Sequence, residues 1–123
     1  MLKFKHYSPI SGLTTLDPRY FGTAKAGRER RRASVPSICL YHPDGEVERI
    51  FNGCTLYHVP IDTSLLYDLS SDKLELLDKY PDFSKVERVI KRRGFLGYWL
   101  PGASGLFKGQ ARVFKRIACH VES

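Results

Sequence analysis

Hydrophobic and polar residues alternate from the second residue of the chain onward. Leu2, Phe4 and His6 fall on one face of an extended segment. The other face carries Lys3, Lys5 and Tyr7. A period of two residues is typical of a half-buried strand, and Pro9 prevents further pairing because it has no N–H group. The pattern predicts a strand over residues 2–8 that carries His6 and Ser8 to its end, beside a loop. An edge strand with a solvated tip explains the same pattern without any site.

Five later segments carry the same kind of strand signal. They cover residues 35–42, 46–51, 54–59, 95–100 and 110–121. A Pro-Asp-Gly turn at 43–45 and an Asn-Gly pair at 52–53 separate the first three segments, and both are typical turn sequences. The chain is therefore predicted to form a meander of antiparallel strands over residues 37–59, closed by Pro60.

Apolar residues at helical spacing predict a helix over residues 85–93. Asp82 or Ser84 can cap its start, and the glycine that follows can end it. Glu87 and Lys91 are four residues apart, so they are predicted to pair on the helix surface.

Two shorter helices are predicted over residues 28–33 and 73–79. The sum is about six short strands with two or three helices between them. This order favours an α+β fold with mostly antiparallel strands. A length of 123 residues favours a single domain spanning residues 1–123.

The composition is that of an ordinary soluble domain, with 42% hydrophobic and 27% charged residues. No apolar run approaches the roughly 20 residues that a membrane helix needs, and the lysine-containing start does not resemble a secretory signal. Cys39, Cys54 and Cys119 are odd in number and widely spaced. They are therefore expected to be reduced, buried thiols in a cytoplasmic protein.

The formal charge of +7 is concentrated in two basic clusters, residues 28–32 and 91–93. An excess of positive charge suits an acidic partner: a nucleic acid, an acidic protein surface or a phosphate-rich cofactor. A solvated basic face is the plainer explanation.

Several common chemistries lack their sequence patterns. The four histidines show no metal-ligand spacing, so no metal site is expected. No nucleophile elbow is present for a serine hydrolase. Gly22 and Thr23 precede a basic segment that begins at Arg28, and such a loop can cradle phosphate through its N–H groups.

Aromatic residues lie near the ends of several predicted strands. They are Tyr41, Tyr57, Tyr98 and Trp99. A planar heterocycle needs an aromatic platform and directional hydrogen bonds to its edge. His6 and Ser8, together with one of the tyrosines, would supply both, although a core or rim position explains any single tyrosine.

A series of short motifs keeps its order along nearly the whole chain. The motifs are His6-Tyr7-Ser8, Gly12-Leu13, Leu16-Asp17-Pro18, Gly22-Thr23, a basic stretch with Glu29, Leu66-Tyr67-Asp68-Leu69, Val86-Glu87, Ile90-Lys91, and residues 94–99. Their order resembles that of small ADP-ribosyltransferase domains from phages and mobile elements, in the clade with a His-Tyr-acid/Gln triad. Some members of this group are anti-CRISPR proteins.

The resemblance implies a split antiparallel β-sandwich with two to three short helices and NAD clamped between the sheets. It implies that His6 holds the ribose and the nicotinamide amide, that Tyr41 stacks on nicotinamide, and that Arg28 or Arg30 balances the diphosphate charge. The cofactor-binding residues implied are His6, Tyr7, Ser8, Gly22, Thr23, Arg28 and Tyr41.

The third member of the triad differs from the acid that is common in active relatives. Gln110 stands where a glutamate would begin the late strand, and residues 94–121 contain no Asp or Glu. A glutamine can hydrogen-bond a ribose, but it brings no negative charge to a developing cation. The catalytic set implied by the resemblance is His6, Tyr41 and Gln110.

Three functions follow as hypotheses. The first is an NAD-dependent mono-ADP-ribosyltransferase that modifies a host protein or ribonucleoprotein, for example a type I CRISPR complex. The second is a catalytically inactive member of the fold that acts as a basic binding protein or inhibitor. The third is a module that contacts nucleic acid directly through its basic surface.

Overall fold

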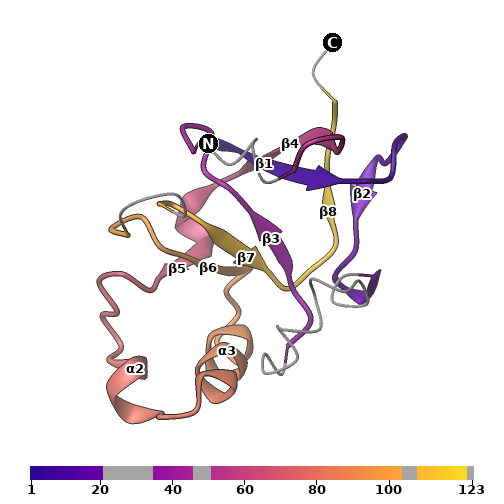
Figure 1. Ribbon diagram of the computed structural model, residues 1–123. Coiled ribbons are helices and arrows are strands. Elements are labelled where there is room, and N and C mark those ends of the chain that lie inside the picture. The colour runs from indigo at the N-terminus through magenta and orange to yellow at the C-terminus, as the bar shows by residue number, and fades with distance from the viewer. Residues whose placement is uncertain (21–34, 46–50, 104–107, 122–123) are drawn as a thin grey trace.

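The computed structural model describes residues 1–20, 35–45, 51–103 and 108–121. The fold is mixed α+β, as predicted, with small sheets and two α-helices in the described residues (Figure 1). The strands are β1 (Leu2–Ser8), β2 (Thr15–Leu16), β3 (Ile38–Leu40), β4 (Thr55–Ile61), β5 (Leu66–Asp68), β6 (Gly97–Trp99), β7 (Ala111–Val113) and β8 (Ile117–Ala118). The helices are α2 (Leu76–Lys79) and α3 (Phe83–Arg92), with 3-10 turns η1 (Pro18–Tyr20) and η2 (Thr63–Leu65).

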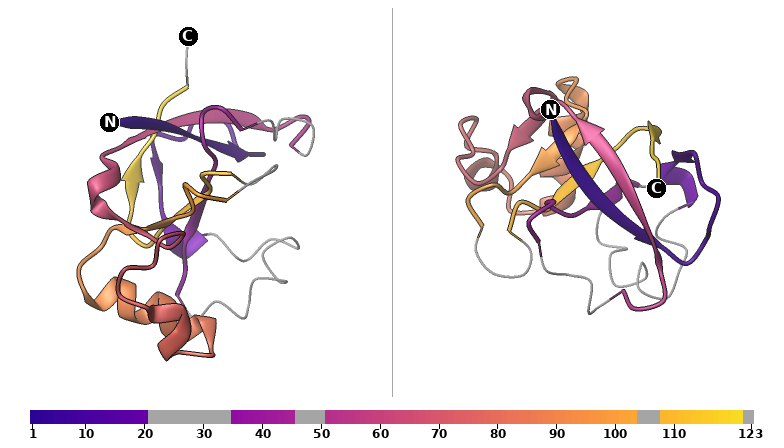
Figure 2. Two further views of the ribbon diagram at one scale, coloured as in Figure 1. Left: turned by 90° about the vertical axis from the view of Figure 1, so that its left-hand side faces the viewer. Right: turned by 90° about the horizontal axis from the view of Figure 1, so that it is seen from above.

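Three sheets make up the β-structure. Their strand orders are β1-β4, β2-β8 and β3-β7-β6-β5, and every pair is antiparallel except β5 with β6. Isolated bridges connect the sheets, Lys5 with Tyr41 and His58 with His120. In two views at right angles, β1 and β4 lie at one end of the molecule and α2 and α3 at the other (Figures 1 and 2).

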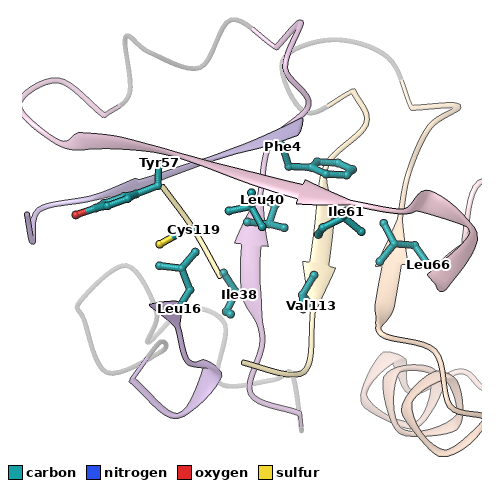
Figure 3. Packing of buried hydrophobic residues seen from close by; sticks show 11 residues of the cluster. Phe4, Leu16, Ile38, Leu40, Tyr57, Ile61, Leu66, Val113 and Cys119 are labelled. Atoms are coloured by element: carbon teal, nitrogen blue, oxygen red, sulfur yellow. The ribbon is translucent and has the colours of Figure 1, made fainter. Parts of the chain in front are cut away.

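The strand predicted over residues 2–8 is confirmed as β1. Phe4, His6 and Ser8 are buried, because alternate side chains of a strand point to the same face. Phe4 lies in an apolar core between the β1–β4 pair and the sheet that contains β3 and β7 (Figure 3). Among the described residues, no helix has the length and apolar character needed to cross a membrane.

The predicted meander over residues 37–59 is wrong. β3 pairs with β7 and β4 pairs with β1, so neighbouring segments of sequence belong to different sheets. Pro60 also lies within β4 instead of closing it. Lys5 and His58 use their N–H groups on the bridges to Tyr41 and His120, so the Lys5–His58 pair is not hydrogen-bonded. Pro60 pairs with Lys3, two residues further along, which is the next pair without hydrogen bonds. The missing N–H group of Pro60 therefore costs no bond to β1.

The segment predicted as one long strand over residues 110–121 is two short strands, β7 and β8. Phe114 interrupts it, because its ring packs in a second core with α3. Of the other predicted elements, residues 46–50 and the helix over 28–33 lie outside the described residues.

Helix α3 begins and ends close to the predicted positions. Asp82 is its N-cap and accepts a hydrogen bond from Ser84 N at 3.0 Å. Gly94 follows the helix with φ of +92°, a conformation that glycine adopts without a Cβ clash. The predicted surface pair of Glu87 with Lys91 is wrong: Glu87 is fully buried and bonds Tyr98 Oη at 2.9 Å.

Candidate active site

The candidate site lies where β1 and β3 separate. Lys5 and Tyr41 exchange two backbone hydrogen bonds of 2.8 Å, which form the bridge between these strands. One residue further along β1, the contact with β3 is made by a side chain: His6 Nδ1 lies 3.0 Å from the carbonyl oxygen of Cys39. A side chain thus replaces the ladder at the point where the two sheets part.

His6 is 5% exposed and lies on the Phe4 face of β1. A carbonyl oxygen can only accept, so Nδ1 carries the proton and Nε2 is the acceptor nitrogen. Burial lowers the pKa of His6, and the hydrogen bond to Cys39 offsets part of that effect. His6 is therefore a neutral imidazole at neutral pH.

Gln110 reaches the same cysteine from the start of β7. Its Nε2 donates to Cys39 Sγ at 2.8 Å, across 71 positions of sequence. His6 therefore bonds the backbone of Cys39, and Gln110 bonds its side chain. Two of the three predicted catalytic residues meet at Cys39, which the sequence analysis assigned to the core.

Tyr41, the third predicted residue, belongs to an aromatic cluster with Tyr7 and Phe51. The rings of Tyr7 and Phe51 stack with centroids 4.9 Å apart and an angle of 7° between their planes. Tyr41 lies 5.3 Å from Phe51 and 6.1 Å from Tyr7, with both pairs tilted. Tyr41 is 5% exposed, whereas Tyr7 and Phe51 are half-buried.

The predicted residues do not all share one face. Tyr41 is directly opposite Lys5, so its side chain lies on the face of β1 that carries Lys5 and Tyr7. His6 lies on the other face, with Phe4. Cys39 is two residues before Tyr41 and therefore shares its side of β3. The structure thus places Tyr41, Cys39 and Gln110 on one side and His6 behind the Cys39 backbone.

The remaining predicted cofactor residues fall into two groups. Ser8 is buried, and its Oγ accepts from Ile10 N at 3.1 Å, so the hydroxyl stabilises the turn after β1. Gly22, Thr23 and Arg28 lie outside the described residues.

A row of side chains extends from Cys39 across the four-stranded sheet. The register places Cys39 opposite Arg112, Arg112 opposite Tyr98, and Tyr98 beside Tyr67. The Arg112 guanidinium Nη1 donates to Ser37 Oγ at 3.2 Å. Glu87 of α3 closes the row through Tyr98.

Cys39, Phe51 and Arg112 also belong to this region, although they are not among the site residues predicted from the sequence. Cys39 and Arg112 each lie two residues from a predicted site residue, Tyr41 and Gln110, so strand periodicity was the available signal. Phe51 carried no such signal, since its contact with Tyr7 depends on the fold.

All three cysteines are free thiols. Cys39 and Cys119 are buried as expected, and Cys54 is only partly buried. The described residues contain no group of three or more His, Cys, Asp or Glu side chains that could hold a metal ion.

Comparison of the chain with protein-family models, with characterised proteins and with solved structures finds no match in any of the three.

Proposed function

We propose that the protein is an NAD-dependent mono-ADP-ribosyltransferase of a phage or mobile element that modifies a host macromolecule in the host cytoplasm. The observation that carries the proposal is the meeting of three distant segments where β1 and β3 separate. His6 and Gln110 both bond Cys39, and Tyr41 follows two residues later. The single bridge between β1 and β3 supports a split sandwich of the ADP-ribosyltransferase kind.

The residues of the site suit NAD in part. The half-buried rings of Tyr7 and Phe51, with the buried Tyr41 ring packed against both, form an apolar aromatic surface that suits a planar heterocycle. The amide of Gln110 can donate to or accept from a ribose hydroxyl, and Nε2 of His6 can accept from one. Because His6 is 5% exposed, its contact requires the ligand to enter where β1 and β3 part.

NAD supplies an ADP-ribosyl group with nicotinamide as the leaving group. Transfer breaks the glycosidic C–N bond with the electron pair leaving on nicotinamide, while the acceptor side chain forms the new bond and releases its proton to water. In the proposal, Tyr41 orients the leaving ring and Gln110 fixes the ribose. Gln110 adds no charge at the developing cation, so the proposal predicts slow turnover.

The test is incubation of the protein with adenylate-labelled NAD and a host-cell lysate. The proposal predicts labelled protein and released nicotinamide, retained in Tyr41→Phe and lost in Tyr41→Leu, because only phenylalanine keeps the ring. Absence of both labelled product and nicotinamide release with the wild-type protein would reject transferase activity.

The second candidate is a catalytically silent member of this fold that acts as a basic binding protein or inhibitor of a host defence complex. The observation that favours it is the absence of any Asp or Glu in residues 94–121. It predicts that His6→Ala leaves the biological effect intact and that charge reversal of residues 30–32 abolishes it. The transferase hypothesis predicts the reverse for His6→Ala.

A further inference from the structure

Helix α3 separates its charges completely between two faces. Its buried side is formed by Ser84, Val86, Glu87 and Ile90. From residue 85 to residue 93, every exposed side chain is a lysine or an arginine: Lys85, Arg88, Lys91, Arg92 and Arg93. We call these five residues the α3 basic face. Glu87, the single carboxylate of the helix, is 0% exposed and bonds Tyr98, so it neutralises nothing at the surface.

This arrangement is unfavourable for the helix by itself. Lys85 and Arg88 are three residues apart, and Arg88 is three and four residues from Lys91 and Arg92, so like charges are neighbours on the helix surface. The helix dipole favours Lys91 and Arg92 in the last turn and disfavours Lys85 in the first. The Asp82 carboxylate at the N-cap attracts Lys85 and Arg88 and offsets only part of this repulsion. Within the described part of the chain, none of the five forms an ion pair, and a polyanion would relieve their repulsion.

The chemistry of the face favours a nucleic acid over an acidic protein. Protein interfaces are centred on buried aromatic or aliphatic anchors, and the exposed positions from 85 to 93 contain none. Lysine and arginine can bind phosphates without any apolar anchor, and such contacts carry no sequence information. The exposed ring of α3, Phe83, packs edge-on against Tyr98 and lies outside the α3 basic face, so this face lacks the rings on which the bases of single strands stack.

The dimensions of the face suit one strand of a duplex. Lys85 and Arg92 are seven residues apart, or about 10 Å along the helix axis. Along the duplex axis, this length corresponds to about three phosphates of one strand, at a rise of roughly 3.4 Å per nucleotide. Helix α3 also lies at the end of the molecule opposite β1 and β4 (Figures 1 and 2), so a duplex there would leave the candidate active site open.

We propose that the α3 basic face binds the phosphate backbone of duplex nucleic acid without reading its sequence. This binding surface is independent of NAD and of any transferase activity.

The test is fluorescence anisotropy with a labelled DNA duplex of arbitrary sequence, from about 50 to about 200 mM salt. The variant Lys85→Gln/Arg88→Gln/Arg92→Gln removes three charges from the face. The matched control Lys108→Gln/Lys115→Gln/Arg116→Gln removes three exposed charges from loops on either side of β7. Each variant lowers the formal charge of +7 by three, and thermal unfolding verifies that both are folded.

The proposal predicts that the α3 variant loses about three units of the slope of log K against log salt, and binds about tenfold or more weakly. The control should keep its slope to within about one unit. The proposal is overturned by an equal loss in both variants, by no wild-type binding at low salt, or by tighter binding of the single strand. Equally tight binding of polyglutamate through the same face would also overturn it, by indicating an acidic protein partner.

Discussion

Each end of the molecule buries a titratable side chain whose pKa shifts, and the two pKa values shift in opposite directions. At the end with β1 and β4, His6 is 5% exposed and bonds the carbonyl of Cys39. At the helical end, Glu87 is fully buried and bonds the Tyr98 hydroxyl. Burial lowers the pKa of His6 and raises the pKa of Glu87. Loss of solvation disfavours the charged form of either group, so a histidine and a carboxyl shift in opposite directions.

The two ends differ in the polar groups that they bring together. The His6 end brings an imidazole, an amide, a thiol and three aromatic rings together from sequence-distant segments. The Glu87 end keeps its carboxyl under a helix whose exposed residues from 85 to 93 are all basic. Glu87 is fully buried and accepts a hydrogen bond from Tyr98, so its carboxyl is closed to solvent.

The largest effect is expected from disrupting the pairing of β6 with β7. A Cβ atom on Gly97 of β6 would lie 1.9 Å from the carbonyl oxygen of Arg112 in β7. Gly97→Ala should therefore destabilise the fold by about 3 kcal/mol or more, as measured by urea unfolding. Gly94→Ala is the control, since it meets no atom within 4 Å and costs about 1 kcal/mol through its positive φ alone. Equal losses in the two variants would contradict the close approach of β6 and β7.

The next largest effect is expected from adding a negative charge at Gln110. Under the transferase hypothesis, Gln110→Glu supplies a negative charge at the ribose and should raise the rate of nicotinamide release by about 10² to 10³. Gln110→Met is the matched control, because it keeps the length of the side chain and adds no charge. A rate for the glutamate variant no higher than that of the methionine variant would argue against an oxocarbenium-like step at this position.

Burial of His6 is expected to make the folded protein less stable at acidic pH. Its pKa is lowered in the folded state, so protons bind more tightly to the unfolded chain. Wild-type stability should fall as the pH is lowered through 6.5 toward the folded pKa, and His6→Gln should remove this loss. Thermal unfolding between neutral and acidic pH measures it, with His120→Gln as an exposed control. Parallel pH curves for wild type and His6→Gln would disprove the burial effect.

Burial of Glu87 is expected to have the opposite effect and to make the folded protein less stable as the pH rises. This effect should be the smallest of those described. Its pKa is raised in the folded state, so its favourable contribution is complete below 4.5 and is lost as the pH rises through the folded pKa. Glu87→Gln keeps an acceptor for Tyr98 without a charge and should gain stability over wild type as the pH increases. Glu75→Gln, at an exposed position, should show no such trend. A constant difference between Glu87→Gln and wild type from acid to neutral pH would contradict it.

Local elements could be predicted from the sequence, because their causes are local. The alternation in residues 2–8 and the cap at Asp82 predicted β1 and α3 closely. Strand partners could not be predicted, since β3 with β7 and β4 with β1 depend on contacts far apart in sequence. The inward position of Glu87 was hidden because an i, i+4 charge pair suggests a surface and gives no sign of Tyr98.

Three residues of the candidate site were named from the sequence, but Cys39, Phe51, Arg112 and the arrangement of the site were not. His6, Tyr41 and Gln110 were named, and the fold brings two of them to Cys39 and the third two residues away from it. Their placement on two faces of the β1–β3 junction follows from the register of one bridge, which no sequence pattern reports. Their roles toward NAD stay predictions.

The central claim, that this junction binds NAD, is tested most directly by thermal unfolding against increasing NAD concentration. Specific binding must raise the melting temperature with the logarithm of ligand concentration once the site saturates. The transferase hypothesis predicts such a rise for the wild-type protein and for Tyr41→Phe, and a much smaller rise for Tyr41→Leu. No rise for the wild-type protein at millimolar NAD, or the same rise in Tyr41→Leu, would contradict the claim.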